Sequence, residues 1–197
     1  MKKKVFFGLL VVVMTLAVAT AGCTSSTNSS SGGASPSASA APQNITGYAT
    51  YTNATAGVRI QYPSGWNVTA GGSNGSIVTF SALKGAVSVG LFLNNESSTK
   101  TNLDEFKNIT VSEALNNASS GLNYTLVSTE KTTLAGMPAY NLTLTATTSS
   151  GVTVKQMVMM TEKDYQVYQL TYVTTPALFP DYQNDFSNMT NSFAITS

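Results

Sequence analysis

The sequence predicts an α+β domain whose central, mainly antiparallel sheet is flanked by helices, and three observations support this. After residue 45 most of the chain consists of short runs in which apolar and polar residues alternate, a pattern typical of half-buried strands. Short turns separate these runs, and hairpin turns join neighbouring strands in antiparallel fashion. Two other segments repeat apolar residues with a helical period, so we expect two helices that pack on more than one face of the sheet.

The first two strands are predicted at residues 47–52 and 57–62, around a turn at 53–56. In the second strand three apolar residues alternate with polar ones, and Pro63 ends it because proline cannot donate to a strand ladder. Trp66, the only tryptophan, follows this turn and is expected to be a core anchor. On that basis, replacing the indole by alanine should destabilise the domain by about 3–5 kcal/mol.

A second hairpin is predicted from strands at 76–83 and 86–94, and a helix follows at 102–116. Asn102 is a suitable N-cap with Glu105 in the capping-box position, so these two side chains can bond free amides of the first turn. The apolar side of this helix is expected to consist of Leu103, Phe106, Ile109 and either Ala114 or Leu115.

Four more strands are predicted at residues 123–131, 139–147, 152–162 and 166–174. The turns between them are expected at 134–138, 149–151 and 163–165. In the strand at 139–147, alternation predicts that Tyr140, Leu142 and Leu144 point inward while Asn141 and Thr143 point outward. The segment 152–160 is apolar on both faces, which is typical of a central strand covered on each side.

The last element is predicted to be a helix, because apolar residues recur at alternating spacings of three and four. Pro180 lies near its start, a position where proline is tolerated. Residues 193–195 are expected to close the domain as a short strand. The stripe comprises Phe179, Tyr182, Phe186, Met189 and Phe193.

Residues 1–22 read as a secretory signal, in which three lysines precede an apolar run at 5–21 and small residues precede Cys23. This order resembles a lipobox, where the cysteine becomes the lipidated first residue of the mature protein, although Thr20 stands where a large aliphatic residue is usual. The alternative is an uncleaved signal anchor. Both readings locate the domain on the outer face of the cytoplasmic membrane, at the cell surface.

Residues 23–44 form a Ser-, Thr- and Ala-rich tether with little apolar surface to bury, so we predict that it is disordered and assign the domain to 45–197. Eleven of the sixteen asparagines begin Asn-X-Ser/Thr sequons, whereas composition alone would give about four. We therefore predict a glycosylated protein and favour an archaeal envelope over a bacterial one; the alternative is accidental sequons on a Ser/Thr/Asn-rich surface. One sequon begins at Asn28, and the candidate glycosylation sites are Asn44, Asn53, Asn67, Asn74, Asn95, Asn108, Asn117, Asn123, Asn141 and Asn188.

Composition excludes several function classes. Without its first three lysines the chain has seven basic and nine acidic residues, so it lacks the basic footprint of a nucleic-acid-binding protein. Histidine is absent and Cys23 is the only cysteine, so the chain has neither a Cys/His zinc site nor an internal disulfide, and a serine nucleophile lacks its usual base. Arg59 is the only arginine. We predict no enzyme activity, no metal and no cofactor.

The remaining candidate residues each have a structural explanation that we favour. Three acidic pairs, Asp104/Glu105, Glu162/Asp164 and Asp181/Asp185, offer weak binding of a hard cation such as calcium, but capping or solvation accounts for them. Three methionines are potential copper(I) ligands through their thioether sulfurs, but their alternation along the strand fits core filling. Five aromatic residues offer a sugar-binding platform, but core packing is commoner. These two sets are Met157, Met159 and Met160, and Tyr62, Trp66, Tyr140, Tyr168 and Tyr172.

Three short motifs stand in order along the domain: the turn at 62–66 (YPSGW), the turn at 134–140 (LAGMPAY), and 168–172 (YQLTY) followed by a helix and Ser192-Phe193. Together they resemble PsbP-like domains, relatives of the extrinsic oxygen-evolving-complex protein of photosystem II. The resemblance spans residues 48–195 and implies a central antiparallel sheet flanked by helices, an α/β/α sandwich. It also implies a non-enzymatic docking role on a larger assembly, with manganese or calcium retention in photosynthetic members. We carry over the fold, and not the metal or photosystem role.

We therefore predict a membrane-anchored extracytoplasmic lipoprotein with a non-catalytic interaction or assembly domain, whose partners are the membrane and an envelope protein. A cell-surface binding module for a sugar, peptide or cation is the alternative. An envelope hydrolase is the least favoured reading, because the acids are scattered and histidine is absent.

Overall fold

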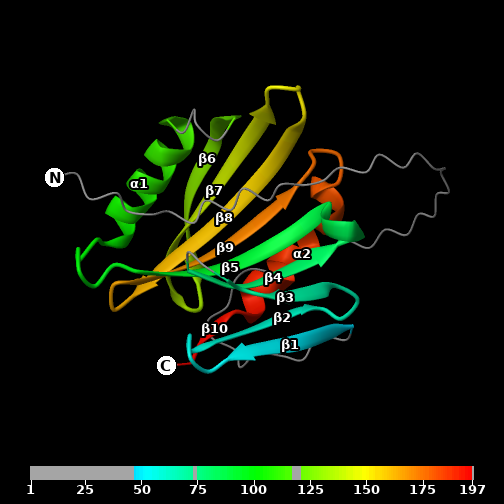
Figure 1. Ribbon diagram of the computed structural model, residues 1–197. Coiled ribbons are helices and arrows are strands. Elements are labelled where there is room, and N and C mark those ends of the chain that lie inside the picture. Colours follow the sequence, from blue (N-terminus) through cyan, green and yellow to red (C-terminus); the bar gives the residue numbers. More distant parts are fainter. Residues whose placement is uncertain (1–46, 73–74, 117–120, 197) are drawn as a thin grey trace.

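The computed structural model describes residues 47–72, 75–116 and 121–196, which form two antiparallel sheets, two α-helices and one short 3-10 turn (Figure 1). This arrangement confirms the predicted α+β class. In these residues no helix combines the length and the apolar character that crossing a membrane would require. The signal segment, Cys23 and the tether fall outside the described range.

The smaller sheet joins the two ends of the domain. Its order is β1-β2-β10, with β1 at Tyr48–Asn53, β2 at Val58–Pro63 and β10 at Ala194–Ile195. Both pairings are antiparallel, and β10 places the chain's last strand beside β2. The predicted strands and the short closing strand are thereby confirmed, while the contact between β2 and β10 is a long-range feature that no local pattern indicates.

The larger sheet has seven antiparallel strands in the order β3-β4-β5-β9-β8-β7-β6. Six of these strands correspond to predicted ones. The unpredicted one is β3, which is short and exposed at every residue, so it carries no buried face for a sequence pattern to indicate. The strands are β3 (Asn67–Ala70), β4 (Ser76–Ala82), β5 (Val87–Asn95), β6 (Leu122–Leu134), β7 (Met137–Thr148), β8 (Thr153–Lys163) and β9 (Gln166–Thr174), and the 3-10 turn η1 (Leu83–Gly85) joins β4 to β5.

The hairpin between β6 and β7 is tighter than the predicted turn at 134–138. Leu134 pairs with Met137, so only Ala135 and Gly136 form the turn, with φ angles of 53° and 76°. Positive φ at both central residues is the geometry that matches the right-handed twist of paired strands. A register shift between Leu126 and Ser128 interrupts the same hairpin and leaves Val127 58% exposed.

Helix α1, Leu103–Asn116, begins with the predicted capping box. The Glu105 amide donates to the Asn102 side chain at 3.0 Å, and the Asn102 amide donates to the Glu105 carboxylate at 3.2 Å. Its buried residues are Phe106, Thr110 and Ala114, one turn apart. On the predicted apolar side, Leu103 and Ile109 are half-buried, and of the two alternatives Ala114 is buried while Leu115 is 48% exposed.

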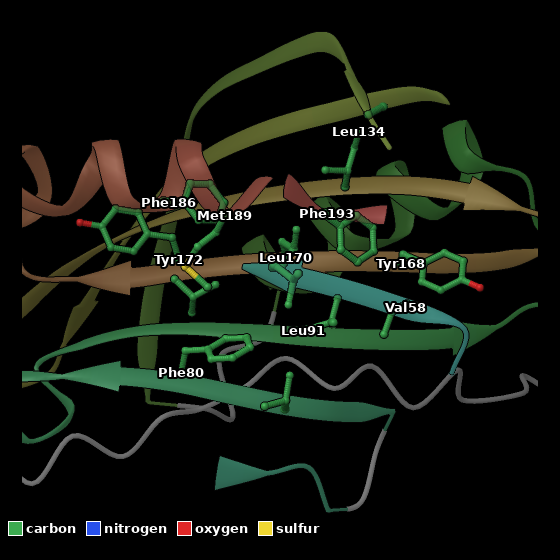
Figure 2. Close-up of a cluster of buried hydrophobic side chains, with 14 of the residues drawn as sticks. Val58, Phe80, Leu91, Leu134, Tyr168, Leu170, Tyr172, Phe186, Met189 and Phe193 are labelled. Atoms are coloured by element: carbon green, nitrogen blue, oxygen red, sulfur yellow. The ribbon is translucent and has the colours of Figure 1, made fainter. Parts of the chain in front are cut away.

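Helix α2, Phe179–Ser192, packs between β2 of the small sheet and β9 of the large one (Figure 1). The predicted stripe faces the core, with only Tyr182 half-buried, and Pro180 occupies the first turn. Figure 2 shows side chains from α2, β4, β5 and β9 in this main cluster. Tyr172 lies at its centre, with ring centroids 4.8 Å from Phe179 and 5.4 Å from Phe186.

A second buried cluster lies on the opposite face of the large sheet, under α1. It contains Phe106 and Ala114 of α1 with side chains of β7, β8 and β9. The two helices therefore cover different faces of the sheet, as predicted. Strand β8 is an inner strand with side chains packed on both faces, as the apolar run at 152–160 predicted. Its neighbour β9, the fourth of the seven strands, is buried along almost its whole length.

Two predicted side-chain positions need correction. Thr143 is buried instead of pointing outward, because β7 is an inner strand and Thr143 lies beside Met157 of β8. Trp66 is half-buried at the margin of the main cluster, with its ring 6.0 Å from that of Tyr182. The centre of the core is instead formed by Tyr172 and its neighbours.

Candidate functional site

An open pocket of about 520 Å³ lies where the start of α1 meets the end of the β6–β7 hairpin. The capping box fixes the first turn of α1, and the two-residue turn places the end of β6 beside the start of β7. Three charged side chains from three elements reach the pocket, namely Asp104, Lys131 and Glu162. The remaining lining residues are Asn102, Leu103, Thr132, Thr133, Pro138, Ala139 and Tyr140.

Tyr140 of β7 is the best-connected side chain of this pocket. Its hydroxyl donates a short hydrogen bond to the Asp104 carboxylate, and the Lys107 ammonium lies 4.8 Å from the centre of its ring. The bond to the Asp104 carboxylate, then burial and the carboxylate's charge, raise the pKa of Tyr140 above its usual value. The phenol therefore stays protonated at neutral pH and acts as a donor that orients Asp104.

Glu162, on the neighbouring strand β8, has a structural role in its own hairpin. Its carboxylate accepts a 2.8 Å hydrogen bond from the amide of Tyr165, which lies in the β8–β9 turn. Beside it, the Thr161 hydroxyl donates to the carbonyl of Pro138 at 2.7 Å and ties β8 to β7 under the pocket. The pocket wall is consequently well fixed on this side.

The pocket surface is mainly apolar, with two acidic residues and one lysine among its lining residues. Asp104 and Glu162 come from two different predicted pairs, so the structure groups acids that the sequence did not group. Each carboxylate accepts one hydrogen bond, Asp104 from the Tyr140 hydroxyl and Glu162 from the Tyr165 amide. No cluster of three or more potential metal ligands occurs among the residues described here.

Four other acidic residues lie outside the pocket lining. Asp185 of α2 accepts a 2.5 Å hydrogen bond from the Tyr48 hydroxyl, so it is a tertiary contact and not a merely solvated residue, while Asp181 is exposed. Glu96, between β5 and α1, is 6% exposed and accepts a bond from Thr99 at 2.9 Å. Burial raises the pKa of Glu113 on α1.

The methionines and the aromatic residues belong to the core. Met157 and Met159 pack against the main cluster and Met160 against the second one, so they lie on opposite faces of β8 as core filling requires. Tyr62, Trp66, Tyr168 and Tyr172 pack in or against the main cluster, while Tyr140 belongs to the second. These five rings therefore form no common platform.

The sequons that the structure describes differ in exposure. Asn67, Asn95, Asn108 and Asn123 are exposed, whereas Asn53, Asn141 and Asn188 are half-buried. Asn188 donates to the Tyr48 hydroxyl at 3.0 Å, and the Asn141 side-chain oxygen is buried without a hydrogen-bond partner. The sequons at Asn28, Asn44, Asn74 and Asn117 begin outside the described residues.

Two contributions were missed by the sequence reasoning. Lys131 lines the pocket and Lys107 lies over the Tyr140 ring, but isolated lysines in a strand and a helix give no recognisable motif. Tyr48 links β1 to α2 through Asp185 and Asn188, at sequence separations of 137 and 140 residues. Such contacts leave no local sequence pattern, so only the tertiary structure shows them.

Comparison with known proteins gives one family match and several similarities of fold. The chain matches the PsbP family over residues 46–195. Cyanobacterial PsbP (CyanoP) from Synechocystis sp. PCC 6803 aligns with a TM-score of 0.61 and 19% identity, covering 80% of this chain and 98% of that chain. The Ran-binding protein Mog1p of Saccharomyces cerevisiae aligns with a TM-score of 0.53 and 10% identity, covering 76% of this chain and 96% of that chain.

A structure from Bacteroides thetaiotaomicron VPI-5482 aligns with a TM-score of 0.52 and 11% identity, covering 78% of this chain and 50% of that chain. A search of curated proteins finds no match. At these identities the structural similarities establish a shared fold alone.

Proposed function

Because this chain belongs to the PsbP family, we propose that its domain is a non-catalytic interaction domain that docks on a partner protein of the cell envelope. The observation that carries this proposal is the extent of the family match, which takes in every described strand and helix. Similarity to Mog1p supports it, since that yeast protein of related fold is a Ran-binding protein. The docking role on a larger assembly that the PsbP-like resemblance implies also supports this proposal.

We assign the docking surface to the pocket at the start of α1. Its charged residues come from three elements and have both signs, and a rim of this kind favours a partner of complementary charge pattern. Thr132 and Thr133 beside it are exposed, so a protein surface can approach the hairpin end. The bond from Tyr140 holds Asp104 in place before a partner arrives.

We also propose that residues 1–22 export the chain and that Cys23 anchors it by lipid on the outer face of the cytoplasmic membrane, with 23–44 as tether. The order of lysines, apolar run, small residues and cysteine supports this assignment. An uncleaved signal anchor is the competing form of the same attachment.

Site-specific crosslinking on intact cells tests the docking surface. A photoreactive residue at Thr133 should give a discrete crosslinked species, while the same residue at Thr52, an exposed position on β1, should give none. Adding Lys131→Glu to the Thr133 variant should remove the species. Equal crosslinking at both positions, or none at Thr133, would overturn the assignment.

Intact-mass analysis of the membrane-bound protein tests the anchor. The expected mass is that of a chain beginning at Cys23 plus acyl groups, and Cys23→Ala should abolish the added mass. A chain that retains residues 5–21 would contradict lipidation and support the signal anchor.

A small-molecule binding module is the second candidate, and the pocket volume favours it. A volume of about 520 Å³ suits a ligand of sugar size, and Asp104, Lys131 and Glu162 supply acceptors and a donor. Calorimetric titration with mono- and disaccharides tests this function, with Asp104→Asn as the variant that should weaken binding. Absence of heat with every sugar would remove this candidate.

A further inference from the structure

We propose that N-linked glycans on Asn67 and Asn123 cap the two free edges of the seven-stranded sheet. In the strand order β3-β4-β5-β9-β8-β7-β6, the outer strands are β3 and β6. Asn67 is the first residue of β3, and Asn123 is the second residue of β6. The inference rests on the export step of the proposed function, because glycan transfer of this kind takes place outside the cytoplasm.

Both sequons are accessible in the folded domain. Asn67 is exposed, as is Thr69, the hydroxyl residue that completes its sequon. Asn123 and Thr125 are exposed in the same way on β6. Within the described domain neither asparagine side chain bonds to another side chain, so both amide nitrogens are available to a transferase.

The edges need protection, because in the described part of the chain each outer strand pairs with a neighbouring strand on one side only and carries an exposed valine. Val68 on β3 is 41% exposed, and Val127 at the bulge of β6 is 58% exposed. An uncovered edge of this kind is a template for pairing with another chain. Proteins usually blunt such an edge with charged side chains.

Charge is missing from β3 and from the first eight residues of β6. The four residues of β3 include none that is charged, and β6 carries none before Glu130. Only 10% of the whole chain is charged, so the usual device is scarce throughout. A branched, strongly hydrated glycan supplies the same steric and polar barrier, and Asn67 and Asn123 stand on the uncharged stretches that require it.

Other sequons provide internal controls. In the Asn141 sequon the oxygen of Asn141 and the hydroxyl residue Thr143 are buried, on an inner strand. In the Asn188 sequon the amide is bonded to Tyr48 and Thr190 is 8% exposed. Asn53 closes β1, an edge of the small sheet, but its amide donates to the Tyr51 hydroxyl at 3.3 Å and is therefore already engaged.

The reaction is a glycosyl transfer with a lipid-phosphate-linked oligosaccharide as donor. The amide nitrogen of asparagine forms a bond to the anomeric carbon, and the bond from that carbon to the phosphate oxygen breaks. The lipid phosphate leaves with its electron pair, and the amide gives up one proton to a base of the transferase. No oxidant or reductant is required.

Glycopeptide mass spectrometry of the protein purified from its own cells tests modification. Peptides containing Asn67 and Asn123 should carry glycan in most molecules, while those containing Asn141 and Asn188 should be unmodified. Unmodified Asn67 and Asn123 in protein that reaches the membrane would overturn the inference without touching the proposed docking role. Conversely, glycosylated protein that gives no crosslink at Thr133 would overturn only the docking surface.

Variants of the full chain test the capping role. Asn67→Gln together with Asn123→Gln should increase the dimeric and larger species several-fold in sedimentation, with an unchanged circular dichroism spectrum. Thr69→Ser with Thr125→Ser keeps both sequons and should behave as the parent protein. Adding Val127→Lys to the double glutamine variant should reduce association, because charge replaces the glycan at the β6 edge. A monomeric double glutamine variant would refute the capping role.

Discussion

Tyr48 is the residue that joins the first strand to the last helix. Its hydroxyl donates to Asp185 at 2.5 Å and accepts from Asn188 at 3.0 Å. Burial is the largest influence on its pKa, which is raised, and the Asp185 carboxylate adds to this while the bond from Asn188 opposes it. One phenol thereby links two segments that are far apart in the sequence.

Replacing this hydroxyl should weaken the junction of β1 and α2. Tyr48→Phe removes one donor and one acceptor, so we expect a loss of about 1–2 kcal/mol in the free energy of unfolding. Urea denaturation measures it. The matched control is Tyr51→Phe on the same strand, where the hydroxyl takes part in a single 3.3 Å contact with Asn53. Equal losses in both variants would show that the Tyr48 network contributes nothing specific.

Trp66 contributes less than a fully buried indole. Because its ring is half-buried at the margin of the core, Trp66→Ala should cost about 2 kcal/mol, below the range for complete burial. Thermal or urea unfolding measures this loss, with Val68→Ala as an exposed control nearby. If stability were unchanged but crosslinking at Thr133 were lost, Trp66 would be a binding residue instead.

At the scale of elements, α1 depends on its capping box. Asn102 and Glu105 exchange two hydrogen bonds at the N-terminus, and these fix the turn that carries Asp104 to the pocket. The same turn therefore stabilises the helix and shapes the candidate site. The β6–β7 hairpin supplies the opposite wall through its two-residue turn.

Removing the cap should loosen both features. Asn102→Ala should cost about 1 kcal/mol, because an amide of the first turn loses its side-chain acceptor. Chemical denaturation measures the loss. Asn116→Ala at the exposed C-terminal end of the same helix is the matched control and should cost less. A cap variant as stable as the parent would mean that packing of Phe106 alone holds the helix.

At the scale of the whole molecule, the core contains tyrosines whose pKa is raised. Burial is the main cause for Tyr172, supplemented by the charges of Asp181 and Asp185. Its hydroxyl donates to the carbonyl of Phe179 at 2.9 Å. Burial also raises the pKa of Tyr124. The folded state therefore favours neutral phenols on both sides of the sheet.

This arrangement predicts alkaline destabilisation. An unfolded tyrosine ionises near pH 10, whereas the folded state retains the proton to higher pH. The stability is therefore fully present below about pH 10 and is lost as pH rises toward the folded pKa. Urea midpoints between about pH 8 and pH 11 measure the loss. Tyr172→Phe should show a shallower decline than the parent protein, while the exposed control Tyr165→Phe should not. Identical slopes would contradict the role of Tyr172.

The sequence by itself determined the elements whose signals are local. Alternation at 58–62, the capping pair Asn102 and Glu105, and the stripe from Phe179 to Phe193 all reappear in the structure, because period and capping are properties of neighbouring residues. The motif order also indicated the family correctly.

Only the tertiary structure decided which residues meet across the chain. The order of the strands placed β9 at the centre, and put β3 and β6 with their sequons at the edges. It brought Asp104, Lys131 and Glu162 to one pocket, and Tyr48 to Asp185. Strand order and docking depend on packing between segments far apart in sequence, which leaves no trace in the spacing of residues within any one segment.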